Sequence, residues 1–164
     1  MDYRKATADD LAAICAMVRS AVAAMEARGV FQWDSLYPTE YDFRADADAG
    51  TLFVGERGGA LCAVCAVNKD CDAQYKNGAW KYPACEWLII HRLYVSPALQ
   101  GRGIATRTFA HIESTLRKAG VEAVRLDVFS ENPAALALYR HSGYETVSTA
   151  DWRKGRFFLL EKKL

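Results

Sequence analysis

The spacing of apolar residues along the chain predicts alternating helices and strands. Near the N-terminus, apolar residues recur every three or four positions, which is typical of one face of a helix: Leu11, Ile14, Val18, Val22 and Met25. Thr7 stands where a helix cap is expected, and Gly29 stands where this helix should end. Further helices are expected over residues 39–50, over residues 103–118 and from Pro133, a residue that suits a first helical turn.

Short apolar runs, bounded by Gly, Pro or polar clusters, predict seven strands. They are expected at residues 3–6, 51–56, 60–67, 84–95, 122–128, 144–149 and 156–161. Arg57-Gly58-Gly59 is a tight-turn sequence that should join two of these strands as a hairpin. The polar stretch 68–83, which carries aromatic residues, is expected to be a long connection. This order of elements predicts one α/β domain over residues 1–164, built on a mixed sheet.

Composition and charge argue against several classes of protein. The chain has 164 residues with 21 Lys and Arg against 20 Asp and Glu, a formal net charge of +1. That balance gives no reason to expect a nucleic-acid or membrane partner. No apolar run is long enough to span a bilayer, and the N-terminus lacks the apolar core of a signal peptide. A cytoplasmic location is therefore expected.

The five cysteines do not indicate a disulfide framework or a metal site. Their odd number, with no secretion signal, argues against paired cysteines. Cys62 and Cys65 have the spacing of half a zinc site, but both lie in the predicted strand 60–67. Residues three apart on a strand point to opposite faces and cannot hold one ion together. We therefore expect small buried side chains here and no bound metal.

A glycine-rich turn predicts an anion site. Gly101 and Gly103 follow an apolar strand and directly precede a helix, so their amides should point outward at the positive end of a helix dipole. A diphosphate is the natural ligand for such a turn. The Walker A pattern is absent, and the dinucleotide fingerprint requires Gly or Ala where Thr106 stands. Asp127 has the spacing of a ribose-binding acid, so the second rejection depends on Thr106 alone.

Two ordered motifs point to another phosphate-binding scheme. Gln100-x-x-Gly103-x-Ala105 is followed, after one predicted helix and strand, by Asn132-x-x-Ala135-x-x-x-Tyr139. This pair resembles the acetyl-CoA motif and the second motif of the GNAT superfamily of N-acetyltransferases. The resemblance implies an α/β GNAT fold with a mixed, mostly antiparallel sheet of about seven strands and about four helices. It also implies acetyl-CoA as cosubstrate.

The resemblance further implies which residues contact acetyl-CoA. They are the strand residues whose backbone would pair with the pantetheine, the glycine turn and helix start, and two residues of the second motif: Leu93, Tyr94, Val95, Gln100, Gly101, Arg102, Gly103, Ile104, Ala105, Thr106, Asn132 and Ala135. Asn132 also suits a helix cap. The backbone of the strand would polarise the thioester carbonyl without a side chain.

The catalytic groups follow from the same resemblance. Tyr139 is expected to be the general acid, because a phenol with a pKa of about 10 is nearly matched to a departing thiolate. Three candidates for the general base stay open: His91, Glu86 and an ordered water. His91 suits base chemistry near neutral pH, and regular alternation would place it on the same strand face as Leu93 and Val95.

The acceptor is expected to be the primary amine of a small molecule. Two connections that wall the acceptor pocket in GNAT enzymes carry Trp33 and Tyr37, and Tyr75 and Trp80, while Glu86 is also a candidate to orient the amine. The alternatives are a protein N-terminal or lysine acetyltransferase, or a non-catalytic acetyl-CoA-binding module. A homodimer is possible, since the apolar run 157–160 is consistent with a covered sheet edge.

Overall fold

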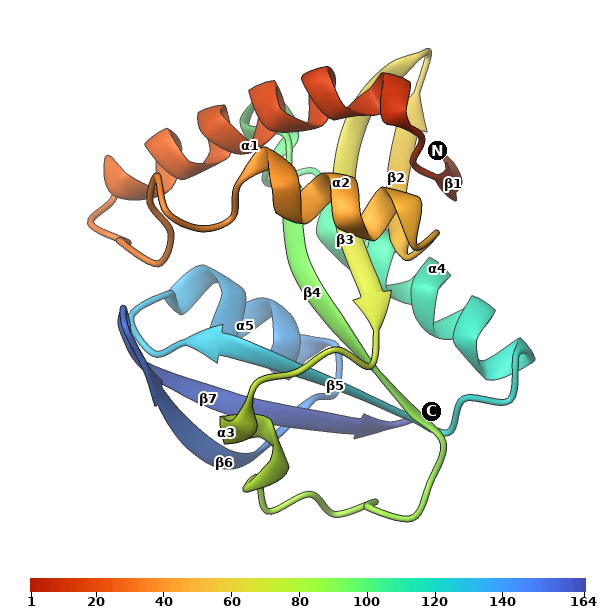
Figure 1. Cartoon of the computed structure of the whole chain (residues 1–164), viewed down its shortest axis with the longest axis vertical. Helices are drawn as coiled ribbons and strands as arrows, with labels where there is room; N and C mark the ends of the chain where they lie inside the picture. Colours follow the sequence, from red (N-terminus) through yellow and green to blue (C-terminus); the bar gives the residue numbers. More distant parts are fainter. The chain divides into compact units, whose positions relative to one another are not determined.

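The computed structural model describes every residue from Met1 to Leu164 (Figure 1). It contains seven strands, five α-helices and two short 3-10 turns. The strands are β1 (Asp2–Lys5), β2 (Leu52–Arg57), β3 (Ala60–Asn68), β4 (Trp87–Val95), β5 (Ala123–Phe129), β6 (Glu145–Trp152) and β7 (Gly155–Lys163). The helices are α1 (Leu11–Glu26), α2 (Glu40–Asp48), α3 (Ala73–Lys76), α4 (Ile104–Lys118) and α5 (Pro133–His141).

The seven strands form one mixed sheet in the order β1-β2-β3-β4-β5-β7-β6. The pair β4–β5 is parallel, whereas β1–β2, β2–β3, β5–β7 and β6–β7 are antiparallel. The expected mixed, mostly antiparallel α/β sheet is therefore confirmed. The chain divides into two compact units, Met1–Val67 with Arg92–Thr108 and Asn68–His91 with Phe109–Leu164. Both β4 and α4 begin in one unit and end in the other.

The first unit packs α1 and α2 over the strands β2 and β3 (Figure 1). The apolar stripe of α1 is buried, and Ile14 has no exposed surface. Phe43 of α2, together with Leu52 and Val54 of β2, completes this core at 1% exposure or less. Thr7, expected to cap the helix itself, caps the 3-10 turn Ala8–Asp10 that leads directly into α1: its amide and hydroxyl both donate to the Asp10 carboxylate, at 2.7 and 3.1 Å.

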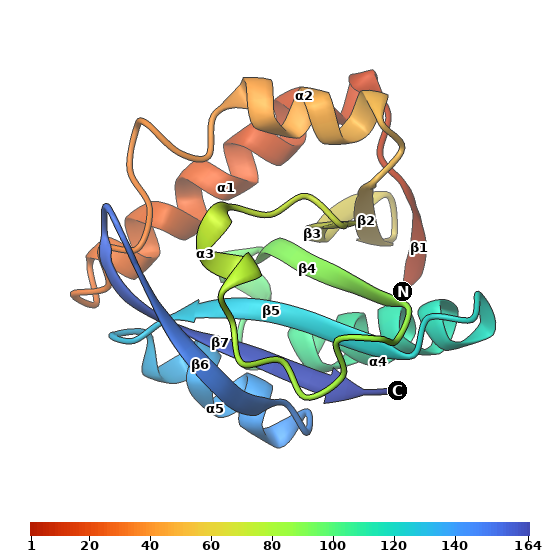
Figure 2. The same ribbon diagram turned by 60° about the horizontal axis from the view of Figure 1, so that its bottom comes forward.

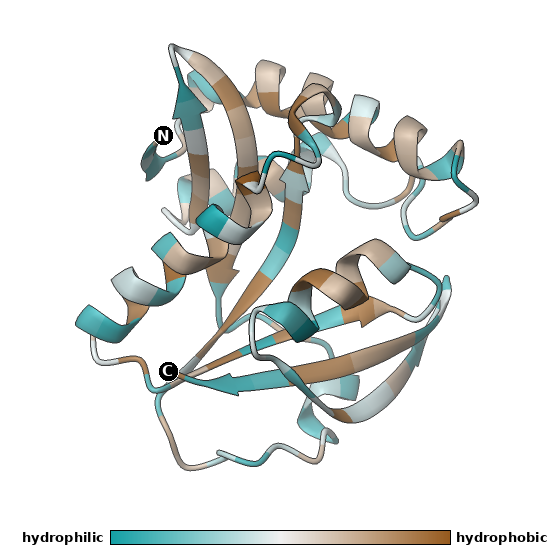
Figure 3. Ribbon diagram, turned by 180° about the vertical axis from the view of Figure 1, so that it is seen from behind, coloured by the Kyte–Doolittle hydropathy of each residue, from teal (hydrophilic) through white to brown (hydrophobic).

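The second unit places β5, β7 and β6 between α5 on one face and α3 on the other (Figure 2). Val124, Leu126 and Val128 of β5 are each at most 1% exposed. In Figure 3, helix α4 carries alternating teal and brown segments, which agrees with the burial of its residues Phe109 and Leu116 at helical spacing.

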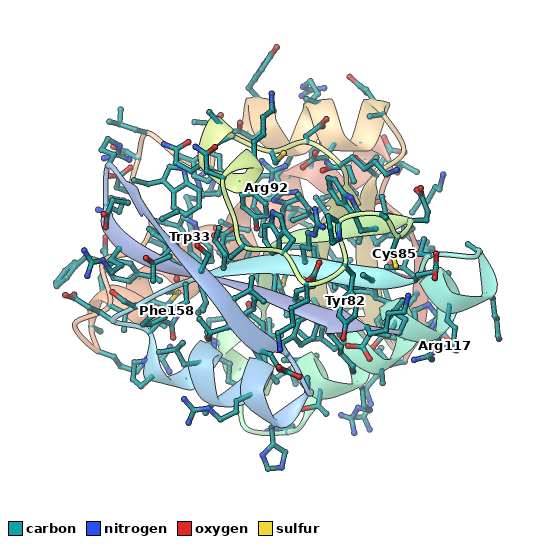
Figure 4. All side chains as sticks on the ribbon, turned by 90° about the horizontal axis from the view of Figure 1, so that it is seen from below. Trp33, Tyr82, Cys85, Arg92, Arg117 and Phe158 are labelled. Carbon is teal, nitrogen blue, oxygen red and sulfur yellow. The ribbon has the colours of Figure 1, made fainter.

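The connection between β3 and β4 is fixed against β5 and β7 by a buried ion pair. Arg125 Nε donates to Glu161 Oε1 at 2.9 Å, and the two side chains are only 5% and 0% exposed. The other oxygen of Glu161 accepts hydrogen bonds from the backbone amides of Lys81 and Tyr82, at 2.7 and 3.2 Å. One carboxylate therefore holds both a cation and a turn of the connection (Tyr82 is labelled in Figure 4).

Two tryptophan rings enclose the same cation. The Arg125 guanidinium carbon lies 4.3 Å from the centre of the Trp80 ring and 4.1 Å from that of Trp87. The pairing of a planar cation with ring faces adds to the ion pair and excludes water from it.

The structure adds detail to three expectations from the sequence. The stretch 68–83 is not wholly irregular, because it forms the single helical turn α3. The strand expected from residue 84 begins at Trp87. The apolar run 157–160 lies on β7, which pairs on both sides with β5 and β6, so burial within the sheet accounts for it. The terminal strand is β6, and a homodimer stays a prediction.

Cys62 and Cys65 lie in β3 as expected and are buried, at 1% and 2% exposure. Burial raises the pKa of the Cys65 thiol to about 12, because the charged thiolate cannot be solvated there. No helix combines the length and apolar character needed to cross a membrane.

We predict that Glu161→Gln lowers the free energy of unfolding by about 3 kcal/mol, because it leaves the buried Arg125 cation without a counter-charge. Urea titration followed by tryptophan fluorescence measures this loss. Glu145→Gln is the matched control, since Glu145 pairs with Lys81 at the surface, with 67% of its side chain exposed, and should change stability by less than about 1 kcal/mol. Equal stabilities for the two variants would contradict the anchoring role of Glu161.

Candidate active site

The glycine turn before α4 has the conformation of an anion site. Gly101 and Gly103 have φ of +74° and +70°, in the left-handed region, and a Cβ on either would meet no atom within 4 Å. The turn is exposed, whereas Ile104, the first residue of α4, is buried. The amide of Arg107 makes a hydrogen bond to the Gly103 carbonyl at 3.1 Å. The amides that precede it at this helix start have no partner within the helix and can receive an anion.

Cationic and polar side chains surround this turn within the first unit. Gln100 donates from Nε2 to the Val95 carbonyl at 3.5 Å and accepts from Arg28 at 3.2 Å. Arg107 donates to the carbonyl of Arg102 at 2.8 Å. Three arginines thus lie at the turn, and their charge favours a phosphate or diphosphate ligand.

Strand β4 leaves the extended conformation at Arg92. Its φ of +52° makes it the only non-glycine residue with a positive φ. A left-handed residue interrupts the regular pleat between His91 and Leu93, so the expectation that His91, Leu93 and Val95 share one strand face stays a prediction. His91 belongs to the second unit, whereas Leu93 and Val95 belong to the first.

The motif residue Tyr139 lies on α5 in an aromatic cluster of the second unit. Its ring centre is 5.4 Å from that of Phe109 and 6.2 Å from that of Tyr144. Asn132 caps the same helix, since its Oδ1 accepts the Ala135 amide at 3.1 Å. The cap starts α5 two turns before Tyr139 and so sets where the phenol lies on the helix.

Glu86, one of the open candidates for the base and for acceptor binding, lies at the surface. Its carboxylate pairs with Lys69 at 2.6 Å, and 55% of its side chain is exposed. A solvated, paired carboxylate of this kind keeps little of the reactivity that a general base needs.

The structure reveals a carboxylate that the sequence did not single out as catalytic. Asp127 lies on β5, two residues beyond Arg125, the last residue of this strand that pairs with β4. Its Oδ1 accepts the hydroxyl proton of Tyr75 at 2.8 Å. The Asp127 side chain is half-buried, while both strand neighbours are buried at 1% exposure. The available signal in the sequence was a lone acid in a strand whose only other charged residue is Arg125.

Burial raises the pKa of Asp127 above the ordinary aspartate range, and Asp72 adds to this, while the Tyr75 hydrogen bond opposes it. The pKa of Tyr75 lies well above its usual range because of burial, the charge of Asp127 and, more weakly, the phenol of Tyr139. Asp127, Tyr75 and Tyr139 therefore lie within electrostatic range of one another in the second unit. Such shifted groups are common where proton transfer occurs.

The four aromatic residues expected at the acceptor site divide between the two units. In the first, Trp33 packs on Tyr94 at 4.4 Å between ring centres, and Tyr37 accepts a hydrogen bond from Arg92. In the second, Tyr75 and Trp80 stack at 5.4 Å. Each pair forms a local cluster, and one shared wall around an acceptor stays a prediction.

Comparison with known proteins agrees with this arrangement. Residues 18–144, more than half of the chain, match the Acetyltransferase (GNAT) family. The N-alpha-acetyltransferase RimI of Mycobacterium tuberculosis is 33% identical over 119 residues, which cover 72% of this chain and 67% of that protein. The mycothiol acetyltransferase of Beutenbergia cavernae is 37% identical over 83 residues, which are 50% of this chain but only 28% of that protein.

Solved structures share the fold at lower identity. A GNAT-family acetyltransferase from Streptococcus agalactiae superposes with a TM-score of 0.86 at 22% identity, covering 99% of this chain and 95% of that one. The yncA protein of Salmonella typhimurium, whose structure contains acetyl-CoA, has a TM-score of 0.71 at 18% identity, covering 99% and 93% of the two chains. With the family match over residues 18–144, these findings show that the chain belongs to the GNAT family of acetyltransferases.

Proposed function

We propose that this protein is a single-domain N-acetyltransferase that transfers the acetyl group of acetyl-CoA to a primary amine. The observation that carries the proposal is the exposed turn before α4, in which left-handed Gly101 and Gly103 lead into unpaired helix amides. The three arginines at this turn would neutralise the pyrophosphate and the nearby phosphate of CoA. The acetyl-CoA in the yncA structure, which has the same fold, supports this choice of cosubstrate.

We assign the proton transfers to three groups of the second unit. The acceptor ammonium gives one proton to the Asp127 carboxylate, and the neutral amine attacks the thioester carbonyl carbon. As the C–N bond forms and the C–S bond breaks, Tyr139 gives its proton to the departing sulfur. Tyr139 regains a proton from the new amide nitrogen, so the net products are the amide, CoA thiol and the proton on Asp127. Tyr75 positions Asp127 through its hydrogen bond.

Asp127 replaces the earlier candidates for the base because its surroundings suit the role. Burial raises the pKa of Asp127 toward neutral pH, and a general base is most effective when its pKa lies near the working pH. Glu86, by contrast, is exposed and paired with Lys69.

The first candidate acceptor is the primary amine of a small molecule. The second candidate acceptor is the N-terminal amine of a protein, which is favoured by the 33% identity to a protein named as an N-alpha-acetyltransferase. We also propose that the enzyme works in the cytoplasm and that the unpaired edge of β6 is where a homodimer would form.

Gly103→Val should abolish measurable acetyl-CoA binding, because a β-branched residue at φ +70° distorts the turn whose amides hold the phosphates. Isothermal titration calorimetry measures the affinity. Gly58→Val is the matched control: Gly58 has φ +59° and open space around it, but lies in the β2–β3 hairpin, so this variant carries similar strain and should bind normally. Normal affinity in Gly103→Val would refute the site.

Tyr139→Phe should lower kcat about 100-fold while the Kd of acetyl-CoA changes little, because only the proton donor is lost. Thiol release from acetyl-CoA in the presence of an amine measures kcat. Tyr144→Phe removes a buried hydroxyl from the neighbouring ring of the same cluster. This variant should keep kcat within about threefold of wild type, because the Tyr144 hydroxyl takes no part in the proposed proton transfers. An unchanged kcat in Tyr139→Phe would remove Tyr139 from the mechanism.

Asp127→Asn should lower kcat/KM about 100-fold and remove the acidic limb of the pH profile. In wild type this limb lies above the ordinary aspartate range, because the pKa is raised and the base acts only when deprotonated. Tyr75→Phe should move the limb to still higher pH, since the hydrogen bond it removes favours the charged carboxylate.

Asp151→Asn is the control for this pair, because Asp151 lies at the surface with 71% of its side chain exposed. Its pH profile should match that of wild type. If Asp127→Asn keeps the wild-type profile, the base is His91, Glu86 or water instead.

A further inference from the structure

Cys85 belongs to a small group of polar side chains at one end of the sheet in the second unit. Lys163 Nζ donates to Cys85 Sγ at 3.0 Å and to the Glu122 carboxylate at 2.8 Å. The Cys85 thiol donates to the same carboxylate at 3.7 Å. The centre of the Tyr82 ring lies 5.5 Å from Lys163 Nζ (Cys85 and Tyr82 are labelled in Figure 4). The proposed acetyl transfer uses none of these groups.

The sheet register brings this group together. Ala123 of β5 pairs with Trp87 of β4 on one side and with Lys163 of β7 on the other. The cysteine lies two residues before Trp87, and Glu122 directly precedes Ala123. The Leu164 amide donates to the Glu122 carbonyl at 2.8 Å. Backbone hydrogen bonds therefore hold three segments that are far apart in the sequence, and with them the contact between sulfur and nitrogen.

Cys85 is also accessible to a small oxidant. Cys85 is half-buried, and 40% of the Lys163 side chain is exposed. The only other half-buried cysteine, Cys71, packs against the apolar cluster around Tyr75. The remaining cysteines are buried: Cys15, Cys62 and Cys65. An ammonium in contact with sulfur favours the thiolate, which is the form that peroxides oxidise, so Cys85 is the cysteine best placed to react.

We propose that Cys85 and Lys163 form a reversible sulfur–nitrogen bond, a sulfenamide, when hydrogen peroxide oxidises the thiolate. Oxidised cysteine condenses with a nearby nitrogen in this way, and the product is reversible. The nitrogen here is a lysine amine that already lies 3.0 Å from the sulfur, the separation of reacting atoms in a near-attack arrangement. The bond ties the end of β7 to the segment that precedes β4.

Lys163 supplies both a proton and the attacking nitrogen in this reaction. The Cys85 thiol loses its proton to solvent, and the thiolate attacks one peroxide oxygen, so that an S–O bond forms, the O–O bond breaks and hydroxide leaves. The hydroxide takes a proton from the Lys163 ammonium, which gives water and a neutral amine. The amine attacks sulfur, an S–N bond forms, and the S–O bond breaks. The second hydroxide removes a proton from nitrogen as water. Sulfur loses two electrons, and one hydrogen peroxide gains them.

The charges around Lys163 agree with this order of events. Contacts with Cys85 and, to a smaller extent, Glu122 raise the pKa of the Lys163 ammonium above its ordinary value. The amine therefore stays protonated, and does not attack, until hydroxide is released beside it. The ion pair with Glu122 keeps the ammonium next to the sulfur in the meantime.

Intact mass and peptide mapping in the absence of reductant test the inference. The reduced full-length protein is treated with one equivalent of hydrogen peroxide, and residual peroxide is removed with catalase. We expect a product that is lighter than the reduced protein by two hydrogen atoms, and dithiothreitol should restore the original mass. After trypsin digestion, residues 82–92 should be linked to residues 163–164. A wild-type product that stops at the sulfenic acid, heavier by one oxygen, would overturn the inference.

Lys163→Arg keeps the positive charge at the sulfur but replaces the amine with a guanidinium, which stays protonated and does not attack. Oxidation of this variant should stop at the sulfenic acid, which dimedone traps. Lys162→Arg is the matched control, because the neighbouring Lys162 pairs with Glu113 at 2.6 Å. This control should form the sulfur–nitrogen bond as wild type does. Loss of two hydrogen atoms in Lys163→Arg would show that another group bonds to the sulfur.

A disulfide between Cys71 and Cys85 also removes two hydrogen atoms, so Cys71→Ser separates the two products. The inference requires the linked peptides to form in Cys71→Ser and to be absent from Cys85→Ser. Loss of the product in Cys71→Ser would identify a disulfide and overturn the sulfur–nitrogen bond. None of these measurements uses acetyl-CoA or an amine acceptor, so their outcome is independent of the proposed function.

Discussion

The buried ion pair between Arg125 and Glu161 is the interaction on which the second unit depends. The two residues face each other across the β5–β7 ladder, so the sheet register itself brings the charges together. Neither charge tolerates burial alone, and each is completed by the connection between β3 and β4, through amides on Glu161 and tryptophan rings on Arg125. These contacts thereby fix the long connection against β5 and β7.

The fixed connection has a chemical consequence. It carries α3, and with it Tyr75, whose hydroxyl reaches Asp127 two residues along the same strand from Arg125. Arg125 and Asp127 thus share one face of β5, the first as a structural cation and the second as a half-buried acid. The pKa of Asp127 is raised because burial removes water from its carboxylate. The hydrogen bond from the Tyr75 hydroxyl stabilises the charged carboxylate and only partly opposes this rise.

A second constraint operates in the first unit, where Arg92 holds a left-handed backbone inside a strand. Such a residue costs about 1 kcal/mol relative to an extended one. The buried pair with Asp46 offsets this cost and ties β4 to α2. The same Asp46 contact, together with the hydrogen bond to the Tyr37 hydroxyl, fixes the orientation of the guanidinium plane.

The sequence by itself determined the number and order of the strands, the capped helices and the glycine turn. These features depend on local rules: helical spacing in α1, apolar runs in β3 and β5, and the freedom of Gly101 and Gly103 to adopt positive φ. The helix-capping role of Asn132 was also predictable, because it requires only the next three residues.

Only the tertiary structure decided the rest of the candidate site. The left-handed backbone of Arg92 could not be predicted, because nothing in its local sequence indicates it, and the Asp46 that pairs with its side chain lies far away in the sequence. The raised pKa of Asp127 could not be predicted either, because it depends on burial and on a hydrogen bond from Tyr75, which lies in a connection distant in the sequence. Local periodicity encodes which face is apolar, whereas the reactivity of a charged group depends on which remote groups fold against it.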